Sequence, residues 1–151
     1  EATVSDISEG AVEQLPPDAD KNQWYVIEGQ ASVIHPSYGG VTTSLVQGSQ
    51  PDAMVLCHNP ERKFVLRKED DHREVPSIKD TMDAHLMMAN MTSAHVNKKA
   101  FIAGISLNTS GMSEEEANDI VKRLSDEHGL PCADPIRHGV SGIIDNLNLD
   151  R

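Results

Sequence analysis

Three short stretches of the chain are apolar almost without interruption and predict buried strands. They cover residues 24–27, 53–57 and 100–107, and residues 130–133 form a weaker fourth candidate. Continuous apolar runs of this length are typical of strands covered on both faces, as in parallel sheets. More than 20 residues separate each run from the next, which is enough for a helical crossover between parallel strands. The pattern therefore predicts a βαβ arrangement and the α/β fold class.

Helices are predicted where apolar residues recur every three or four positions. The best marked helix begins at Ser113, which is placed to form a capping box with Glu116, and ends near Gly129. Three more helices are expected over residues 3–15, over residues 41–46 and after Pro76. Helices thus alternate with the predicted strands along the chain.

Length and composition fit one domain, or part of one. The 151 residues are 38% hydrophobic and 25% charged, and only five are aromatic, so we expect an aliphatic core. The formal net charge of −11 offers no basic surface for a nucleic acid or an anionic membrane. No apolar run reaches membrane-spanning length, and the first residues lack the features of a signal peptide. We therefore expect a cytoplasmic protein without nucleic-acid or membrane partners.

The two cysteines, Cys57 and Cys132, lie in apolar runs and have no second cysteine at the spacing of a zinc or redox motif. A cytoplasmic location keeps thiols reduced. We expect both residues to be reduced thiols in the core, and neither to form a disulfide or to bind zinc.

Polar residues directly follow each predicted strand. They are Glu28 and Gln30 after the first, His58 and Asn59 after the second, Asn108 to Ser110 after the third, and Asp134 and Arg137 after the fourth. Ligands of open α/β sheets bind outside the carboxyl ends of the strands, where these four clusters would meet. Loops are polar in any protein, but four such clusters together favour a binding site at this edge of the sheet.

The stretch between the first two predicted strands, residues 28–52, is the richest in candidate chemistry. Gly39 and Gly40 precede a predicted helix and would expose backbone N–H groups to an anion. His35 and Tyr38 are suited to acid–base work or to substrate binding, although a loop histidine is more often only a hydrogen-bonding residue. The sequence has no Walker, Rossmann, nucleophile-elbow or zinc-protease motif. Spacing alone therefore indicates no more than an α/β domain with a site at one sheet edge.

Four long motifs are more specific. IEGQASVIHPSYGGVT (27–42), LVQGSQPDAMVLCHNP (45–60), GISLNTSGMSEEEA (104–117) and GLPCADPIRHGV (129–140) occur in this order. They resemble the C-terminal P-loop-type domain of the D-glutamate N-acetyltransferase family, formerly grouped as proteins of unknown function. The segment VSDISEGAVEQL, which begins at Val4, resembles the helix that precedes the first of these motifs in the family. The likeness spans nearly the whole chain.

This resemblance implies a three-layer α/β/α fold with a mostly parallel sheet, related to dethiobiotin-synthetase-like P-loop proteins. It also implies acetyl transfer from acetyl-CoA to D-glutamate. Because those P-loop relatives bind Mg²⁺ and ATP, the resemblance makes both of them candidate cofactors. In such relatives a glutamate in the position of Glu28 lies near magnesium and phosphate. An asparagine in the position of Asn108 contacts the base there. A carboxylate suits Mg²⁺, and an amide can both donate to and accept from a purine edge.

On this resemblance we assign candidate roles within the motifs. His35 is the candidate base that deprotonates the substrate ammonium, and Glu28 and Tyr38 complete the candidate catalytic group. Glu28 is also the candidate metal ligand. The candidate substrate- and cofactor-binding residues are Gln30, Ser32, Ser37, Gln50, Asp52, His58, Asn108 and Asp134.

Members of this family are considerably longer, and an N-terminal domain and a phosphate-binding loop precede the part that resembles residues 1–151. We therefore expect a single α/β domain that forms the C-terminal part of a two-domain protein and pairs with a second copy or with the N-terminal half. Two other functions stay open at this point. One is a Mg-ATP-dependent kinase or ligase, and the other is a structural domain without activity.

Overall fold

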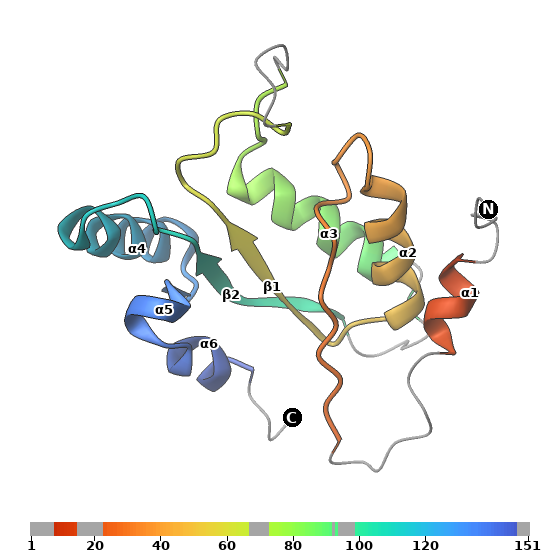
Figure 1. The fold of residues 1–151 in the computed structure, drawn as a ribbon. Coiled ribbons are helices and arrows are strands. Elements are labelled where there is room, and N and C mark those ends of the chain that lie inside the picture. Colours follow the sequence, from red (N-terminus) through yellow and green to blue (C-terminus); the bar gives the residue numbers. More distant parts are fainter. Residues whose placement is uncertain (1–7, 15–22, 67–72, 92, 94–98, 148–151) are drawn as a thin grey trace. The chain divides into compact units, whose positions relative to one another are not determined.

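The computed structural model describes residues 8–14, 23–66, 73–91, 93 and 99–147. Its elements follow one another in the order shown in Figure 1. They are α1 (Ser8–Glu13), α2 (Gly39–Ser49), β1 (Ala53–His58), α3 (Ile78–Met91), β2 (Phe101–Leu107), α4 (Glu114–His128), β3 (Cys132–Ala133), α5 (Pro135–His138) and α6 (Ser141–Asp145). Strands and helices alternate through the C-terminal two thirds of the chain, as an α/β fold requires.

The chain divides into two compact units. The first unit comprises residues 1–52 and 83–100, and the second comprises residues 53–82 and 101–151. The first unit contains α1, α2 and most of α3, and the second contains the sheet and helices α4 to α6. Each unit is described by itself below.

The sheet of the second unit is parallel throughout, as the apolar runs predict. Its strand order is β1-β2-β3. β1 pairs along its whole length with β2, with an irregularity between Met54 and Val55. β3 is short and pairs through Ile105 with Cys132 and through Ser106 with Ala133. All three strands therefore end at the same edge of the sheet.

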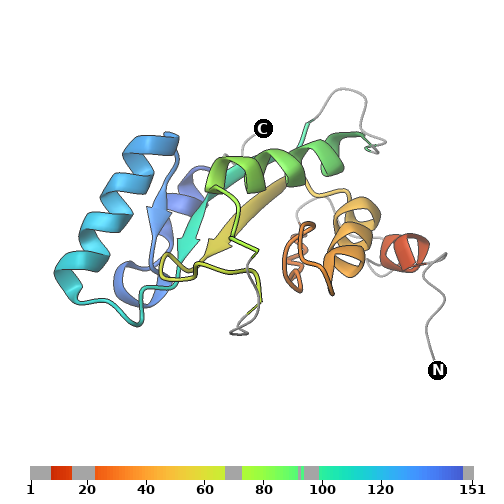
Figure 2. The ribbon, with the colours of Figure 1, turned by 90° about the horizontal axis from the view of Figure 1, so that it is seen from above.

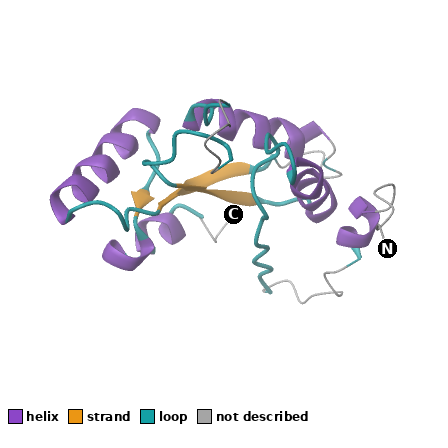
Figure 3. Ribbon diagram, turned by 45° about the horizontal axis from the view of Figure 1, so that its top comes forward, coloured by secondary structure: helices purple, strands orange, loops and turns teal. Residues whose placement is uncertain are grey.

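The central strand β2 carries the core of this unit. Ala103, Ile105 and Leu107 are each 1% exposed or less and share one face, because side chains alternate along a strand. On the other face Gly104 lies against Ile143 of α6. Figure 3 shows α4 on one side of β3 and α5 with α6 on the other. The sheet is thus covered by helices on both faces near β3.

Helix α4 forms as its end signals predict. Ser113 accepts a hydrogen bond from the Glu116 backbone N–H at 3.3 Å, and the Glu116 carboxylate accepts one from the Ser113 backbone N–H at 2.9 Å. Gly129 ends the helix with a left-handed φ of 63°, which glycine adopts without steric strain. The buried residues Ala117, Ile120 and Leu124 form one stripe along the helix. Figure 2 shows α4 running beside β3.

Helices α1 and α2 of the first unit pack closely at Gly48. A Cβ at this position would lie 2.4 Å from the Glu9 carbonyl oxygen, so only glycine allows the approach. Ser44 lies one turn earlier on α2, and its hydroxyl donates to the Glu9 carboxylate at 2.9 Å. The predicted helix over residues 3–15 is therefore present as α1 within the described residues, while residues 3–7 and 15 lie outside them.

Two predictions from the apolar runs are wrong. Residues 24–27 are not a strand: Val26 is 95% exposed, and none of these four residues belongs to a strand or a β-bridge. An extended apolar segment becomes a strand only when a neighbouring strand satisfies its backbone groups.

The second wrong prediction concerns Cys57, which is exposed and not in the core. Strand β1 is an edge strand, and its face with Val55 and Cys57 is not covered by the described residues. Both cysteines are free thiols, and burial raises the pKa of Cys132 to about 11.

We predict that Gly104→Ala destabilises the second unit. The added methyl group would lie 2.7 Å from the Pro131 carbonyl oxygen and 2.8 Å from Ile143 Cγ1, and overpacking of this kind costs about 1–3 kcal/mol. Gly142→Ala is the matched control, because the nearest atom to its Cβ is 3.9 Å away. Urea denaturation of the two variants measures the difference, and equal midpoints would contradict this packing.

Candidate functional site

The ends of the three parallel strands are tied together by polar contacts. The Asn108 backbone N–H donates to the His58 carbonyl oxygen at 2.9 Å and links the loops that follow β1 and β2. The Thr109 backbone N–H donates to Asp134 Oδ2 at 3.0 Å and links the loops that follow β2 and β3. The structure therefore brings together three of the predicted site residues, His58, Asn108 and Asp134, in the second unit. We call this region the carboxyl edge.

Asp134 is the most constrained of the three. The residue is 4% exposed, and its carboxylate also accepts from the Thr109 hydroxyl and from the backbone N–H groups of Ile136 and Arg137, at the start of α5. These hydrogen bonds, the one from the Thr109 hydroxyl foremost, lower the pKa of Asp134 to about 2. The carboxylate thus serves as the N-cap of α5 and as the link between β2 and β3.

The loop after β2 is fixed by residues of α5. Arg137 Nη2 donates to the carbonyl oxygens of Met112 at 2.8 Å and of Thr109 at 3.3 Å. His138 Nδ1 accepts from the Asp134 backbone N–H at 3.3 Å, and His138 Nε2 contacts Asn118 Oδ1 at 2.8 Å. Thr109 belongs to the polar cluster that the sequence predicts after this strand, but its contact with Asp134 is not predicted, because a contact between positions 25 residues apart leaves no local sequence signal. His138 is not among the predicted site residues.

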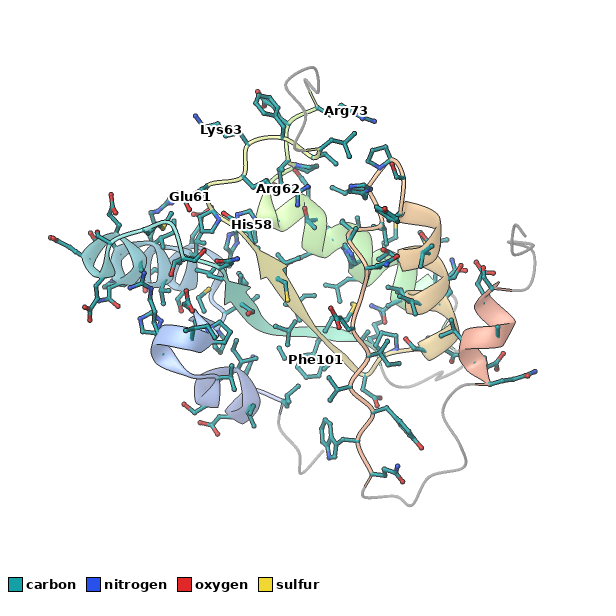
Figure 4. All side chains as sticks on the ribbon, viewed as in Figure 1. His58, Glu61, Arg62, Lys63, Arg73 and Phe101 are labelled. Atoms are coloured by element: carbon teal, nitrogen blue, oxygen red, sulfur yellow. The ribbon has the colours of Figure 1, made fainter. Side chains whose placement is uncertain are left out.

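His58 and Asn108 carry the available chemistry of the carboxyl edge. His58 is half-buried, and burial lowers the pKa of its imidazole, so the ring is neutral at physiological pH. Asn108 is exposed, and its Oδ1 accepts from the Ser110 backbone N–H at 3.1 Å. Within the described ranges no acceptor contacts the Asn108 amide nitrogen. Figure 4 shows His58 at the carboxyl end of β1, opposite to Phe101 at the start of β2.

A basic loop follows His58 directly. It consists of residues 59–66 and 73–75 and is closed by a bridge between Phe64 and Glu74. The Val75 N–H donates to the Lys63 carbonyl oxygen at 2.9 Å, and Val65 N–H donates to that of Arg73 at 2.9 Å. The described part of this loop carries three cations, Arg62, Lys63 and Arg73, and two acids, Glu61 and Glu74, and Figure 4 shows the cations beyond the end of β1.

Two of these basic-loop residues are fixed by backbone contacts. The Arg62 guanidinium folds back onto the Phe64 carbonyl oxygen at 3.1 Å. Glu61 lies over Gly111, where any Cβ would collide with its carboxylate. The Glu61 side chain therefore lies close to the loop that follows β2.

The second group of predicted site residues forms one turn in the first unit. The His35 backbone N–H donates to the Ser32 carbonyl oxygen at 2.9 Å, and the Gly39 N–H donates to that of His35 at 2.8 Å. His35 Nδ1 accepts from the backbone N–H groups of Ser37 at 3.1 Å and Tyr38 at 3.2 Å. The His35 and Tyr38 rings lie 5.2 Å apart, centroid to centroid. Ser32, His35, Ser37 and Tyr38 are thus neighbours, and we call residues 32–39 the His35 turn.

The remaining predicted residues are not gathered into this turn. Glu28 and Gln30 lie in an exposed segment without regular structure. Gln50 follows the last residue of α2 in a left-handed conformation, φ 44°, and Asp52 precedes β1. The 11 residues of α2 separate Gln50 from Tyr38, a helix length of about 16 Å.

The predicted magnesium site rests on one candidate ligand, Glu28. In the part of the chain that the structure describes, no three His, Cys, Asp or Glu side chains are grouped as a metal centre would require. Magnesium needs only one or two carboxylates when substrate phosphates supply the other ligands. The role of Glu28 therefore stays a prediction.

None of the helices in the described ranges has the length and apolar character needed to cross a membrane.

A parallel sheet with helices on both faces and polar loops at its carboxyl edge defines an α/β domain. Residues 1–144 match the family model described as "Domain of unknown function (DUF1611_C) P-loop domain". The chain belongs to this DUF1611 family. It is also similar to the crystal structure of a DUF1611 family protein from Anabaena variabilis, with a TM-score of 0.69 and 29% identity over 80% of this chain and 34% of that one.

Two curated relatives carry a functional name. The chain is 42% identical to a D-glutamate N-acetyltransferase from Pseudoalteromonas and 43% identical to one from Tritonibacter scottomollicae. Each match covers 97% of this chain but 42% of the relative. The chain therefore spans about two fifths of the length of these proteins, and both the family and the fold expected from the four motifs are confirmed.

We predict that Asp134→Asn destabilises the carboxyl edge. Both carboxylate oxygens accept hydrogen bonds, and the variant would place the donating NH₂ group of an amide at one of these two positions. The free energy of unfolding at neutral pH should fall by about 1–3 kcal/mol. Asp119→Asn, at an exposed position on α4, is the control and should change it little.

The same pair tests the pH dependence. The pKa of Asp134 is lowered to about 2 in the folded state. The carboxylate therefore contributes its full share to the free energy of unfolding above the ordinary aspartate pKa, and this share is lost as the pH falls toward the pKa of the folded state. Urea denaturation measures the difference in free energy of unfolding between wild type and Asp134→Asn, which should be smaller at about pH 3 than at neutral pH. No difference at neutral pH, or an equal difference in acid, would contradict the structural role of the Asp134 carboxylate.

Proposed function

We propose that the protein to which this chain belongs transfers an acetyl group from acetyl-CoA to the amino group of D-glutamate. The observation that carries the proposal is the similarity to two relatives named for this activity, which extends over 97% of this chain. The matched region includes the loops at the carboxyl edge, where ligands of open α/β sheets bind. The chain supplies part of the machinery, and further residues of the whole protein contribute to it.

The reaction sets three requirements. The substrate ammonium must lose a proton, so that the amine nitrogen can attack the thioester carbonyl carbon. Hydrogen-bond donors must stabilise the oxyanion that forms there. The C–S bond then breaks as the C–N bond is completed, and the CoA thiolate takes up a proton.

His58 meets the first requirement. Its ring is neutral at physiological pH because burial lowers the pKa of the imidazole, and a neutral imidazole accepts a proton. Asn108 meets part of the second requirement, because its amide nitrogen is a donor beside the same strand end. We assign proton acceptance to His58 and carbonyl or carboxylate binding to Asn108.

The phosphates of acetyl-CoA require cations, and the basic loop offers them. Lys63 is exposed, in a loop that starts next to His58. Arg62 is held rigid by its bonds to the Phe64 and Val65 carbonyl oxygens. A preorganised guanidinium and an ammonium group suit the binding of phosphate oxygens.

The P-loop description of the family favours a second function, Mg-ATP-dependent phosphoryl transfer or ligation. The two functions differ in what they consume. Acetyl transfer uses acetyl-CoA and proceeds without ATP, whereas the kinase or ligase hydrolyses ATP without acetyl-CoA. Assaying each cosubstrate alone with D-glutamate separates them.

We predict that His58→Gln lowers kcat/KM for acetyl transfer about 100-fold or more, the usual contribution of a general base. The protein produced from its complete gene is assayed for CoA thiol release in the presence of D-glutamate. Cys57→Ser is the control, because it changes the preceding, exposed residue of the same strand. A His58→Gln enzyme with the wild-type rate would remove this residue from the mechanism.

We predict that Lys63→Ala raises KM for acetyl-CoA about fivefold, the effect of losing about 1 kcal/mol of binding free energy. The change should shrink at high salt, which screens an exposed charge. Lys79→Ala, at an exposed position on α3, is the control. A KM that rises for D-glutamate instead would place the cation at the other substrate.

A further inference from the structure

Strand β1 has a neighbouring strand on one side only. It pairs with β2 along its whole length, and β3 lies beyond β2. The His58 carbonyl oxygen accepts from the Asn108 backbone N–H, so the His58 backbone faces β2. Because the backbone groups of successive residues alternate between the two sides of a strand, those of Val55 and Cys57 face the other side. On that side, which we call the open edge of β1, the described residues provide no strand.

The open edge of β1 lacks the features that keep an edge strand from pairing. Natural edge strands are very short, contain proline or charged residues, or are bent by a bulge. β1 has the ordinary length of a strand, six residues, and its sequence AMVLCH contains no proline, lysine, arginine, aspartate or glutamate. The register irregularity leaves its extra residue, Ala103, on β2, so β1 itself is not interrupted. An edge of this kind is a template for a further strand.

The burial of β1 and the size of the sheet indicate the same thing. A strand made almost entirely of apolar residues is typical of a parallel sheet that is covered on both faces. Val55 is nevertheless 43% exposed, and Cys57 is exposed. The described sheet has three strands, of which β3 has two residues, whereas sheets have about five or six strands on average. Both observations favour a sheet that continues beyond β1.

A further strand of the same protein fits this edge better than a second copy does. Each curated relative is matched over 42% of its length, so more than half of such a protein lies outside the matched region. A strand on the same polypeptide reaches the edge at a high effective concentration, whereas a second copy loses translational freedom when it associates. The three described strands are parallel, and purely parallel sheets are more frequent than chance pairing would give.

We infer that the open edge of β1 binds a parallel strand supplied by the part of the complete protein that lies outside residues 1–151. The added strand accepts hydrogen bonds from the N–H groups of Val55 and Cys57 and donates to their carbonyl oxygens. Because it is parallel, its carboxyl end lies beside that of β1, next to His58. β1 is then an inner strand of a larger sheet. This inference does not depend on the proposed acetyl transfer, and its test measures no activity.

Amide hydrogen exchange tests the pairing in the protein produced from its complete gene. The protein is labelled with ¹⁵N in valine, leucine, cysteine and histidine, and the exchange of single amides is followed by NMR. Leu56 and His58 face β2 and are the internal controls, whose amides should exchange slowly in either case. We expect the Val55 and Cys57 amides to exchange about 1,000-fold more slowly than in an unstructured chain, as paired strands do. Near-unstructured rates for Val55 and Cys57 beside slow controls would overturn the inference.

Two further measurements identify the strand that binds. A second copy would give slow exchange only at protein concentrations where sedimentation shows a dimer, so we expect the exchange rates to be independent of dilution. Residues 24–27 of this chain are the other alternative, and Val26→Pro would prevent them from pairing by removing an amide N–H. We expect slow exchange of Val55 and Cys57 to persist in Val26→Pro. Its loss on dilution or in this variant would assign the edge to a second copy or to residues 24–27, and either result would overturn the inference.

Discussion

The buried carboxylate of Asp134 is the interaction on which the carboxyl edge depends. Strand β3 has only two residues, and its backbone pairing with β2 is correspondingly small. Asp134 extends this connection by accepting two hydrogen bonds from Thr109 and two from the start of α5. Arg137 then holds the loop after β2 from the same helix. A charged group buried at this depth is stable because each of its oxygens is hydrogen-bonded.

This arrangement separates structural polar groups from chemically available ones. Asp134 and Thr109 are fully buried and bonded to one another, whereas Asn108 lies next to Thr109 and is exposed. The rigid link therefore positions an exposed amide, and the Asn108 backbone N–H is bonded to the His58 carbonyl oxygen at the neighbouring strand end. In the first unit the His35 turn uses the same principle, since backbone N–H groups hold one ring nitrogen while the other stays open. Sites held by backbone contacts of this kind are preorganised for binding.

Local signals in the sequence predict the parts of the fold that are determined locally. Ser113, Glu116 and Gly129 specify the ends of α4 because their partners lie within one helical turn. The strand predicted over residues 24–27 is wrong, because an apolar run forms a strand only if another segment pairs with it. Asp134 caps α5 and also links β2 to β3. The second role could not be predicted, since it depends on Thr109, 25 residues away. The hydrogen bonds to the His35 ring likewise follow from the backbone geometry of the turn, which its residue types alone do not determine.

We propose that substrates bind at the carboxyl edge of the parallel sheet. A crystal structure of the protein produced from its complete gene, with D-glutamate and an unreactive acetyl-CoA analogue bound, tests this placement. We expect ligand oxygen atoms within hydrogen-bond distance of the Asn108 amide nitrogen, and the acceptor amine near the His58 ring. Both ligands bound at the opposite edge, beside Phe101, would contradict it.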